Sequence, residues 1–142
     1  MILTHFATAL EAQSAFYTAF QNADLTQMMA VWAEEEDIVC IHPGGTRHTG
    51  VEEIRESWRQ IFSGGPELRF ELVAAREIPG RMTSIHSVYE RITASSGPTS
   101  PTSVVATNIF ALTDRGWQML VHHASQVPDQ PARQDALPTL LH

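Results

Sequence analysis

Three amphipathic helices are predicted in the first half of the chain. Residues 6–22 carry apolar side chains at spacings of three, four or six, with Gln13 among the polar residues on the opposite side, as in a helix with one buried stripe. Asp24 can accept from the amides ahead of it and so cap a second helix. The third helix is predicted over residues 51–62, where a Ser-Gly-Gly-Pro sequence ends the apolar pattern.

Beyond the third helix the hydrophobic period changes from 3.6 residues to two. Residues 68–75 alternate apolar and polar side chains, which predicts a strand with one buried face. Residues 84–92 form another strand whose apolar side chains fall on both faces, and residues 104–112 and 117–125 read as an antiparallel hairpin. Helices first and strands afterwards predict an α+β domain, with the helices packed on one face of a curved antiparallel sheet.

Length and composition narrow the class of protein. The 142 residues fit one domain, with residues 1–127 as the folded part and residues 128–142 as a Pro-containing C-terminal tail. Without an apolar run of membrane-spanning length or a signal-peptide pattern at the N-terminus, we expect a cytoplasmic protein with no membrane partner. The net charge of -7 and the lack of Lys argue against a nucleic-acid partner. Cys40, the single cysteine, lies in an apolar run and is predicted to be a buried, inert thiol.

His42 is the first candidate for chemistry. The apolar run 38–41 predicts a short buried strand, and Pro43-Gly44-Gly45 then turns the backbone, so the imidazole is expected where a strand opens into a loop. An unperturbed pKa near 6.5 suits a histidine for proton transfer or for neutral hydrogen bonding. The alternative is that His42 only caps its turn through the amides of Gly44 or Gly45.

Asn108 and one histidine of the last strand are further candidates. Asn108 shares its strand face with apolar residues, so it either lines a cavity or makes a structural hydrogen bond. Strand alternation lets only one of His122 and His123 face the interior. His123 shares a face with Trp117 and Met119, which predicts His123 inside and His122 outside.

Cofactor and metal sites are not indicated by the sequence. His42, His48, His86 and His123 lack the helical pairing or nearby carboxylates of a metal site, and no nucleotide or phosphate-binding motif is present. We therefore expect no metal and no cofactor. Trp32 and Trp58 belong to helix stripes, where they serve the core, stack on a ligand, or do both.

Several of these features together resemble the nuclear transport factor 2-like superfamily. They are three helices, a strand ending in His42-Pro43, Gly50 before a helix bearing Trp58, and a closing strand ending in His123-Ala124-Ser125. This superfamily includes ketosteroid isomerase, the SnoaL-like cyclases, scytalone dehydratase and the association domain of calcium/calmodulin-dependent protein kinase II. The resemblance covers about residues 6–125. It implies a cone-shaped curved antiparallel sheet with N-terminal helices on its concave face, one enclosed pocket, and a homodimer formed through the outer face of the sheet.

The resemblance also implies roles for individual residues. His42 falls where the isomerase has its general-base aspartate, and Asn108 falls near a protonated aspartic acid that donates to the oxyanion. An amide can donate the same hydrogen bond. The isomerase's tyrosine donor is matched by Phe16, with Tyr17 about 100° further around the helix. This departure argues against steroid isomerisation.

The resulting hypothesis is a SnoaL-like protein that binds a small apolar molecule, as a cofactor-independent isomerase, cyclase or dehydratase of a carbonyl compound. His42 would abstract or relay a proton, Asn108 would hold the carbonyl oxygen, and His123 would orient or acidify. The aromatic residues expected to contact the ligand are Trp32, Trp58, Phe16, Tyr17, Tyr89 and Phe110. The alternative is a non-catalytic oligomerisation or ligand-sensing domain similar to the kinase association domain.

Overall fold

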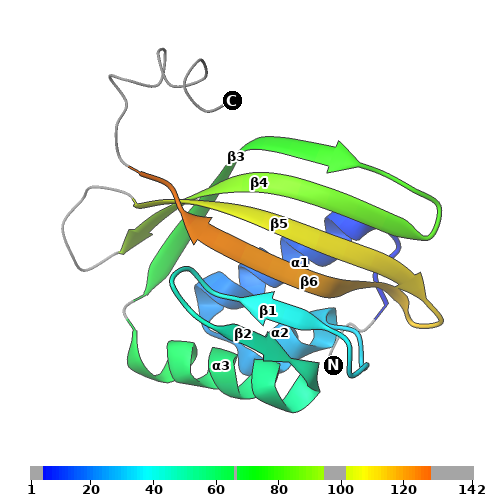
Figure 1. Ribbon diagram of the computed structural model, residues 1–142, viewed down its shortest axis with the longest axis horizontal. Coiled ribbons are helices and arrows are strands. Elements are labelled where there is room, and N and C mark those ends of the chain that lie inside the picture. The colour runs from blue at the N-terminus through cyan, green and yellow to red at the C-terminus, as the bar shows by residue number, and fades with distance from the viewer. Residues whose placement is uncertain (1–4, 66, 95–101, 129–142) are drawn as a thin grey trace.

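The computed structural model describes residues 5–65, 67–94 and 102–128 (Figure 1). Three helices are present, as predicted: α1 (Ala9–Asn22), α2 (Leu25–Val31) and α3 (Gly50–Gly64). The Asp24 side chain accepts from the amide of Gln27 at 3.0 Å, which confirms it as the cap of α2. Among the described residues, no helix is both long and apolar enough to cross a membrane. The predicted tail falls almost wholly on residues 129–142, outside the described residues.

One six-stranded sheet covers the helices, which lie together on one side of it (Figure 1). Its strands are β1 (Val39–Ile41), β2 (Arg47–Thr49), β3 (Leu68–Ile78), β4 (Thr83–Ala94), β5 (Thr102–Thr113) and β6 (Gly116–Gln126). Their spatial order is β2-β1-β6-β5-β4-β3. The predicted α+β class with a curved sheet is confirmed, but the sheet is mixed because β1 pairs with β6 in parallel. Strand β2 is three residues long and was not predicted.

An aromatic cluster holds α1 and α3 against β3. The ring of Phe20 lies 4.7 Å from Trp58 and 4.3 Å from Phe70, measured between centroids. Phe16 packs edge-on against Trp58 at 5.6 Å. Phe16 and Trp58 are both fully buried, and each such ring pair contributes about 1 kcal/mol beyond its buried area. The cluster therefore fixes how α1 and α3 lie beneath the sheet.

A β-bulge in β6 changes which residues face the core. Phe110 pairs with Met119, but the next residue back along β5, Ile109, pairs with Val121, so Leu120 is an extra residue without a partner on β5. An extra residue of this kind reverses the inside–outside alternation on one side of the bulge. Consequently Met119 and His122 are both buried, although they are three residues apart.

Gly116 offers a test of the close approach between the N-terminal segment and the β5–β6 turn. It has φ +89°, and a Cβ there would lie 2.8 Å from both the backbone nitrogen and the backbone oxygen of Phe6. Because the left-handed conformation and the backbone clash both penalise a side chain, Gly116→Ala is expected to lower the free energy of unfolding by about 2 kcal/mol or more in urea titrations. Gly64→Ala is the control, since its Cβ would meet nothing within 4 Å. An equal effect of the two substitutions would contradict this packing.

Candidate functional site

Polar residues form a row that crosses the sheet from edge to edge. The pairing registers align one residue from each strand, in the order His48, Cys40, His122, Asn108, His86 and Glu77. Four of the six are buried, with Asn108 0% exposed and His86 and His122 1% exposed. Burial of so many polar groups requires partners inside the protein.

Asn108 is the central node of these hydrogen bonds. Its Oδ1 accepts from Nδ1 of His122 at 2.6 Å. Its Nδ2 donates to Oε1 of Gln13 at 2.9 Å and to the Tyr17 hydroxyl at 3.2 Å. An Asn amide has two N–H groups and both are used here. Asn108 therefore joins β5 to β6 and to α1, and it has no free N–H group for a ligand.

From α1 the same hydrogen-bond network continues to β4 through both Gln13 and Tyr17. Oε1 of Gln13 also accepts from Nδ1 of His86 at 3.1 Å, and Nε2 of His86 accepts from the Ser84 hydroxyl at 3.1 Å. The Tyr17 hydroxyl donates to the carboxylate of Glu90. The buried network consists of Gln13, Tyr17, Ser84, His86, Glu90, Asn108 and His122. Its hydrogen-bond directions are mutually consistent when every histidine in it is neutral.

Burial controls the protonation of this network. It lowers the pKa of His122 from 6.5 to about 3, with smaller contributions from the charges of His42 and His123, and it also lowers the pKa of His86. Burial raises the pKa of Glu90 from 4.5 to about 7, against a smaller opposing effect of the Tyr17 hydrogen bond. The pKa of Tyr17 is raised by burial and then by the Glu90 charge. Glu90 is thus the group in the network that changes charge near neutral pH.

His42 lies where β1 leads into the Pro43-Gly44 turn, and it forms a second cluster with Ser57 and Trp58. Its Nε2 lies 3.0 Å from Oγ of Ser57, whose hydroxyl donates to the backbone oxygen of Ile54 at 2.8 Å. The Ser57 oxygen therefore accepts from Nε2–H of His42, which leaves Nδ1 unprotonated. Burial, followed by the charge of His48, lowers the pKa of His42 to about 4. The imidazole of His42 is bonded to Ser57, and the turn itself is closed by the Gly45 amide on the His42 carbonyl.

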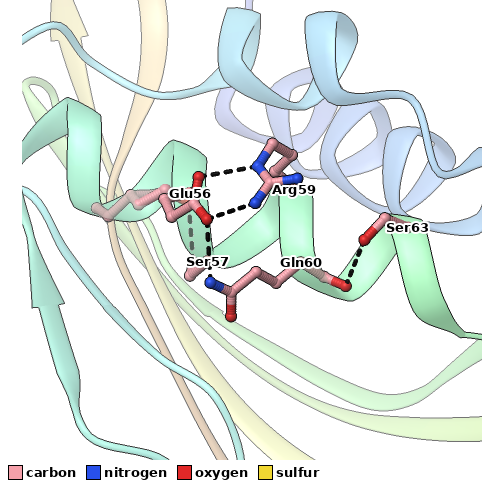
Figure 2. Close-up of polar contacts among 6 residues, drawn as sticks. Glu56, Ser57, Arg59, Gln60 and Ser63 are labelled. Atoms are coloured by element: carbon pink, nitrogen blue, oxygen red, sulfur yellow. Dashed lines mark hydrogen bonds and ion pairs between the residues drawn. The ribbon is translucent and has the colours of Figure 1, made fainter.

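Helix α3 presents Ser57 to His42 while its opposite side faces solvent. Figure 2 shows Glu56 accepting from Arg59 and Gln60 along this exposed side. The donor–acceptor distances are 2.6–3.0 Å. These contacts are between residues three and four apart, as on any solvated helix face. The buried side chains of α3 are Ile54, Ser57 and Trp58, of which Ser57 and Trp58 contact His42.

Trp58 is a ring neighbour of both His42 and His122. Its ring is perpendicular to that of His42 at 4.7 Å, and it lies 6.2 Å from His122, measured between centroids. The indole nitrogens of Trp58 and Trp32 are buried without a hydrogen-bond partner among the described residues. Buried unpaired donors are rare in native proteins, so each calls for an acceptor such as a water or a ligand.

The structure brings most of the predicted site residues to the interior. Seven of them lie on the inner side of the sheet or beneath it: Phe16, Tyr17, Trp32, His42, Trp58, Asn108 and Phe110. Phe16 and Tyr17, which are successive residues of α1, are both buried, and their rings meet at 4.8 Å between centroids.

Two predicted residues lie on the opposite face. His123 is exposed and His122 is buried, so the prediction for this pair is wrong. The reason is the bulge at Leu120, which shifts the alternation between Met119 and the histidines. Tyr89 is 42% exposed on the outer face of β4, because its neighbours Val88 and Glu90 occupy the inner one.

Sequence reasoning missed much of the buried network. Ser84, His86 and Glu90 alternate on one face of β4, and that polar face is the buried one. Gln13 was placed on the solvent side of α1 but is 5% exposed and lies one turn before Tyr17. The period-two spacing of polar residues on β4 was the available signal, although polarity by itself predicts the solvent face.

The fold and interior define the chain as an α+β domain with a buried polar network beneath a curved sheet. The chain belongs to the SnoaL-like domain family, whose model matches residues 10–130. It is 34% identical to a crystal structure from Thiobacillus denitrificans that is provisionally named a calcium/calmodulin-dependent protein kinase type II association domain. That match has a TM-score of 0.82 and covers 87% of this chain and 98% of the other.

Two further relatives extend this comparison. A structure from Streptomyces avermitilis, provisionally named a dehydratase of the NTF2-like family, is 29% identical with a TM-score of 0.76, and the match covers 82% of this chain and 91% of that one. The F-box protein SKIP8 of Arabidopsis thaliana is 24% identical over 118 residues, which are 82% of this chain and 48% of that protein. The chain thus spans about half the length of that curated relative.

Glu90 should make the stability of the fold depend on pH. Because its pKa is raised from 4.5 to about 7, the folded protein binds this proton more tightly than the unfolded chain does. Its contribution to the free energy of unfolding therefore falls by about 3 kcal/mol as the pH rises from 4.5 to above 7. We expect the stability of Glu90→Gln relative to the native protein to increase by that amount between pH 4.5 and 8, measured by urea unfolding.

The difference in stability between the native protein and Glu90→Gln reports the titration of the Glu90 carboxyl alone. The lowered pKa values of His42, His86 and His122 act in the opposite direction, since the unfolded chain binds their protons more tightly below pH 6.5. Both proteins carry these histidines, so their effect cancels. The control is Glu77→Gln, because Glu77 is an exposed carboxylate on the neighbouring strand. A stability difference between native protein and Glu90→Gln that stays constant with pH would contradict the raised pKa.

Proposed function

We propose that the chain is a SnoaL-like small-molecule-binding protein that transfers a proton on a mostly apolar, carbonyl-bearing ligand without a cofactor. The observation that carries this proposal is the indole N–H of Trp58, which is buried and has no partner among the described residues. The Trp58 ring lies 4.7 Å from that of His42 and 6.2 Å from that of His122, measured between centroids. Both histidines are neutral at pH 7, because their pKa values are lowered. An unpaired donor beside neutral imidazoles suits a ligand that has an oxygen acceptor and a removable proton.

Each residue then has a distinct part in the proposed reaction. The Trp58 N–H donates to the ligand oxygen and stabilises the negative charge that develops on it. His42, whose Nδ1 is unprotonated when Ser57 accepts from Nε2–H, accepts the ligand proton. Asn108 is a positioning residue, because its hydrogen bond with Nδ1 of His122 leaves Nε2 of that imidazole as the acceptor. In this proposal Trp58 takes the oxygen-binding role expected for Asn108, and His122 replaces His123.

A second candidate is a non-catalytic oligomerisation domain. The outer face of the sheet carries a cross-strand row of Val73, Tyr89 and Val105, and Tyr89 is 42% exposed. An exposed aromatic flanked by β-branched residues suits a protein interface. The similarity to the provisionally named association domain favours the same role, so we propose that two copies of the chain pair through this face.

Proton transfer can be tested with a cyclic ketone, 1-tetralone, in D2O. We expect the native protein to exchange the protons next to the carbonyl faster than buffer alone, followed by proton NMR. His42→Ala should lower the protein-dependent rate by about 100-fold or more, because it removes the base. Trp58→Phe should lower it by about 100-fold, because it removes the oxygen donor.

Two histidine variants on one strand provide the matched control. His122→Gln should slow the exchange, whereas His123→Gln should leave it unchanged, since His123 is on the exposed face. Circular dichroism would confirm that each variant is folded. Equal rates for native protein, His42→Ala and Trp58→Phe would contradict the proton-transfer proposal.

Pairing through the outer face can be tested by sedimentation velocity. We expect the native chain to sediment as a dimer and Tyr89→Arg to weaken dimerisation by tenfold or more, on the order expected for a central aromatic anchor. Leu10→Arg is the control, because Leu10 is also exposed, at 50%, but lies on α1. A native monomer, or equal dimerisation of Tyr89→Arg, would exclude this interface.

A further inference from the structure

A groove of about 410 Å³ runs between α1 and β3, apart from the His42 and Trp58 cluster. Its apolar part is formed by Leu10, Phe70 and Leu72, and its polar part includes Gln13, Tyr17 and Thr18. None of the side chains that line it carries a formal charge at neutral pH. Gln13 and Tyr17 belong to the buried network and are only 5% and 6% exposed, so the groove leads directly to that network.

Glu90 lies directly behind the wall of this groove. Two independent contacts place it there, since the Tyr17 hydroxyl donates to its carboxylate and Leu72 is its register partner on β3. Glu90 is 2% exposed. A buried carboxylate is costly unless a cation or several donors compensate its charge.

Among the described residues that hydrogen-bond to Glu90 or pair with it in the sheet, none supplies a positive charge. Tyr17 faces it from α1 and acts on it as a hydrogen-bond donor. His86 on the same strand and His122 on β6 are neutral, because burial lowers the pKa of both. The register partners of Glu90, Leu72 on β3 and Val104 on β5, carry no charge. When Glu90 is ionised, above its raised pKa of about 7, none of these neighbours compensates its charge.

The wall of the groove also offers aromatic faces to a cation. The rings of Tyr17 and Phe70 lie 5.8 Å apart between centroids, and both residues line the groove. Cations are attracted to aromatic ring faces, most strongly where water is excluded. Hydroxyl and amide oxygens in the lining can accept hydrogen bonds from an ammonium group. The net charge of -7 also raises the local concentration of cationic ligands.

From these four features we propose that the groove between α1 and β3 binds a small organic cation, a protonated amine with an apolar portion. The ammonium group lies against Tyr17, in front of the Glu90 carboxylate, and the apolar portion lies on Phe70 and Leu72. This site is separate from the proton-transfer site proposed above and stands without it.

The proposal is tested with a charged and an uncharged probe of equal size, 2-phenylethylamine and 2-phenylethanol. Binding to the full chain is measured by NMR titration at pH 8, where Glu90 is ionised. The amine should bind at least about tenfold more tightly than the alcohol. This preference should shrink at pH 5.5, where Glu90 is protonated and the amine is still charged. Equal affinity for the two probes at pH 8 would overturn the proposal.

Two pairs of variants locate the site. Glu90→Gln should remove the preference for the amine, whereas Glu77→Gln should keep most of it. Thr18 is exposed at the groove, so Thr18→Arg can add a positive charge there without entering the core. Thr18→Arg should weaken amine binding about tenfold or more, and Thr18→Gln should not. The Thr18 pair tests the groove even if Glu90→Gln fails to fold. Amine binding that resists Thr18→Arg would place it elsewhere and refute the site.

Discussion

The arrangement of the interior depends on the complete use of the hydrogen-bonding groups of Asn108. One side chain accepts from His122 on β6 and donates to Gln13 and Tyr17 on α1. Asn108 is 0% exposed to solvent, so breaking one of these bonds leaves a buried unpaired group, which costs about 1–3 kcal/mol. The polar row across the sheet and the position of α1 are therefore mutually dependent. Aromatic packing of α1 on α3 and β3 supplies the burial, and the network determines which face of the helix is inward.

In such a network, burial determines which side chains of the interior are charged. The histidines remain neutral because they are desolvated, and each is kept in one tautomer by a partner with a fixed role. Glu90 differs from them, because Tyr17 stabilises its charged form only in part. A fold optimised only for stability would favour an apolar side chain at this position. Retention of a carboxyl that titrates near pH 7 in the interior is therefore more typical of a functional site than of a structural core.

The parts of the fold that depend on local pattern were predictable from the sequence. The helix stripes, the cap at Asp24 and the turn after His42 follow from side-chain spacing and backbone preferences. Register could not be predicted, because a single extra residue at Leu120 reverses the face of every later residue in β6 and exchanges His122 with His123. Polarity was also misleading on β4, where Ser84, His86 and Glu90 are inside and Tyr89 is outside. A polar strand face is predicted to face solvent unless its hydrogen-bond partners on other elements are known. Here the partners of His86 and Glu90 are Gln13 and Tyr17, which are distant in sequence.

Two buried donors of this interior, Asn108 and Trp58, differ in whether their N–H groups already have partners. Asn108 occupies the position where the resemblance to the isomerase implies an oxyanion donor, yet both of its N–H groups are committed within the protein. A ligand oxygen would have to break one of these bonds to reach it. The Trp58 N–H is already buried and unpaired among the described residues, so the desolvation cost of this donor has been met during folding. A ligand oxygen that accepts from Trp58 gains a hydrogen bond without breaking one between described residues. For this reason binding should favour Trp58 over Asn108, even though Asn108 has the more familiar position in the fold.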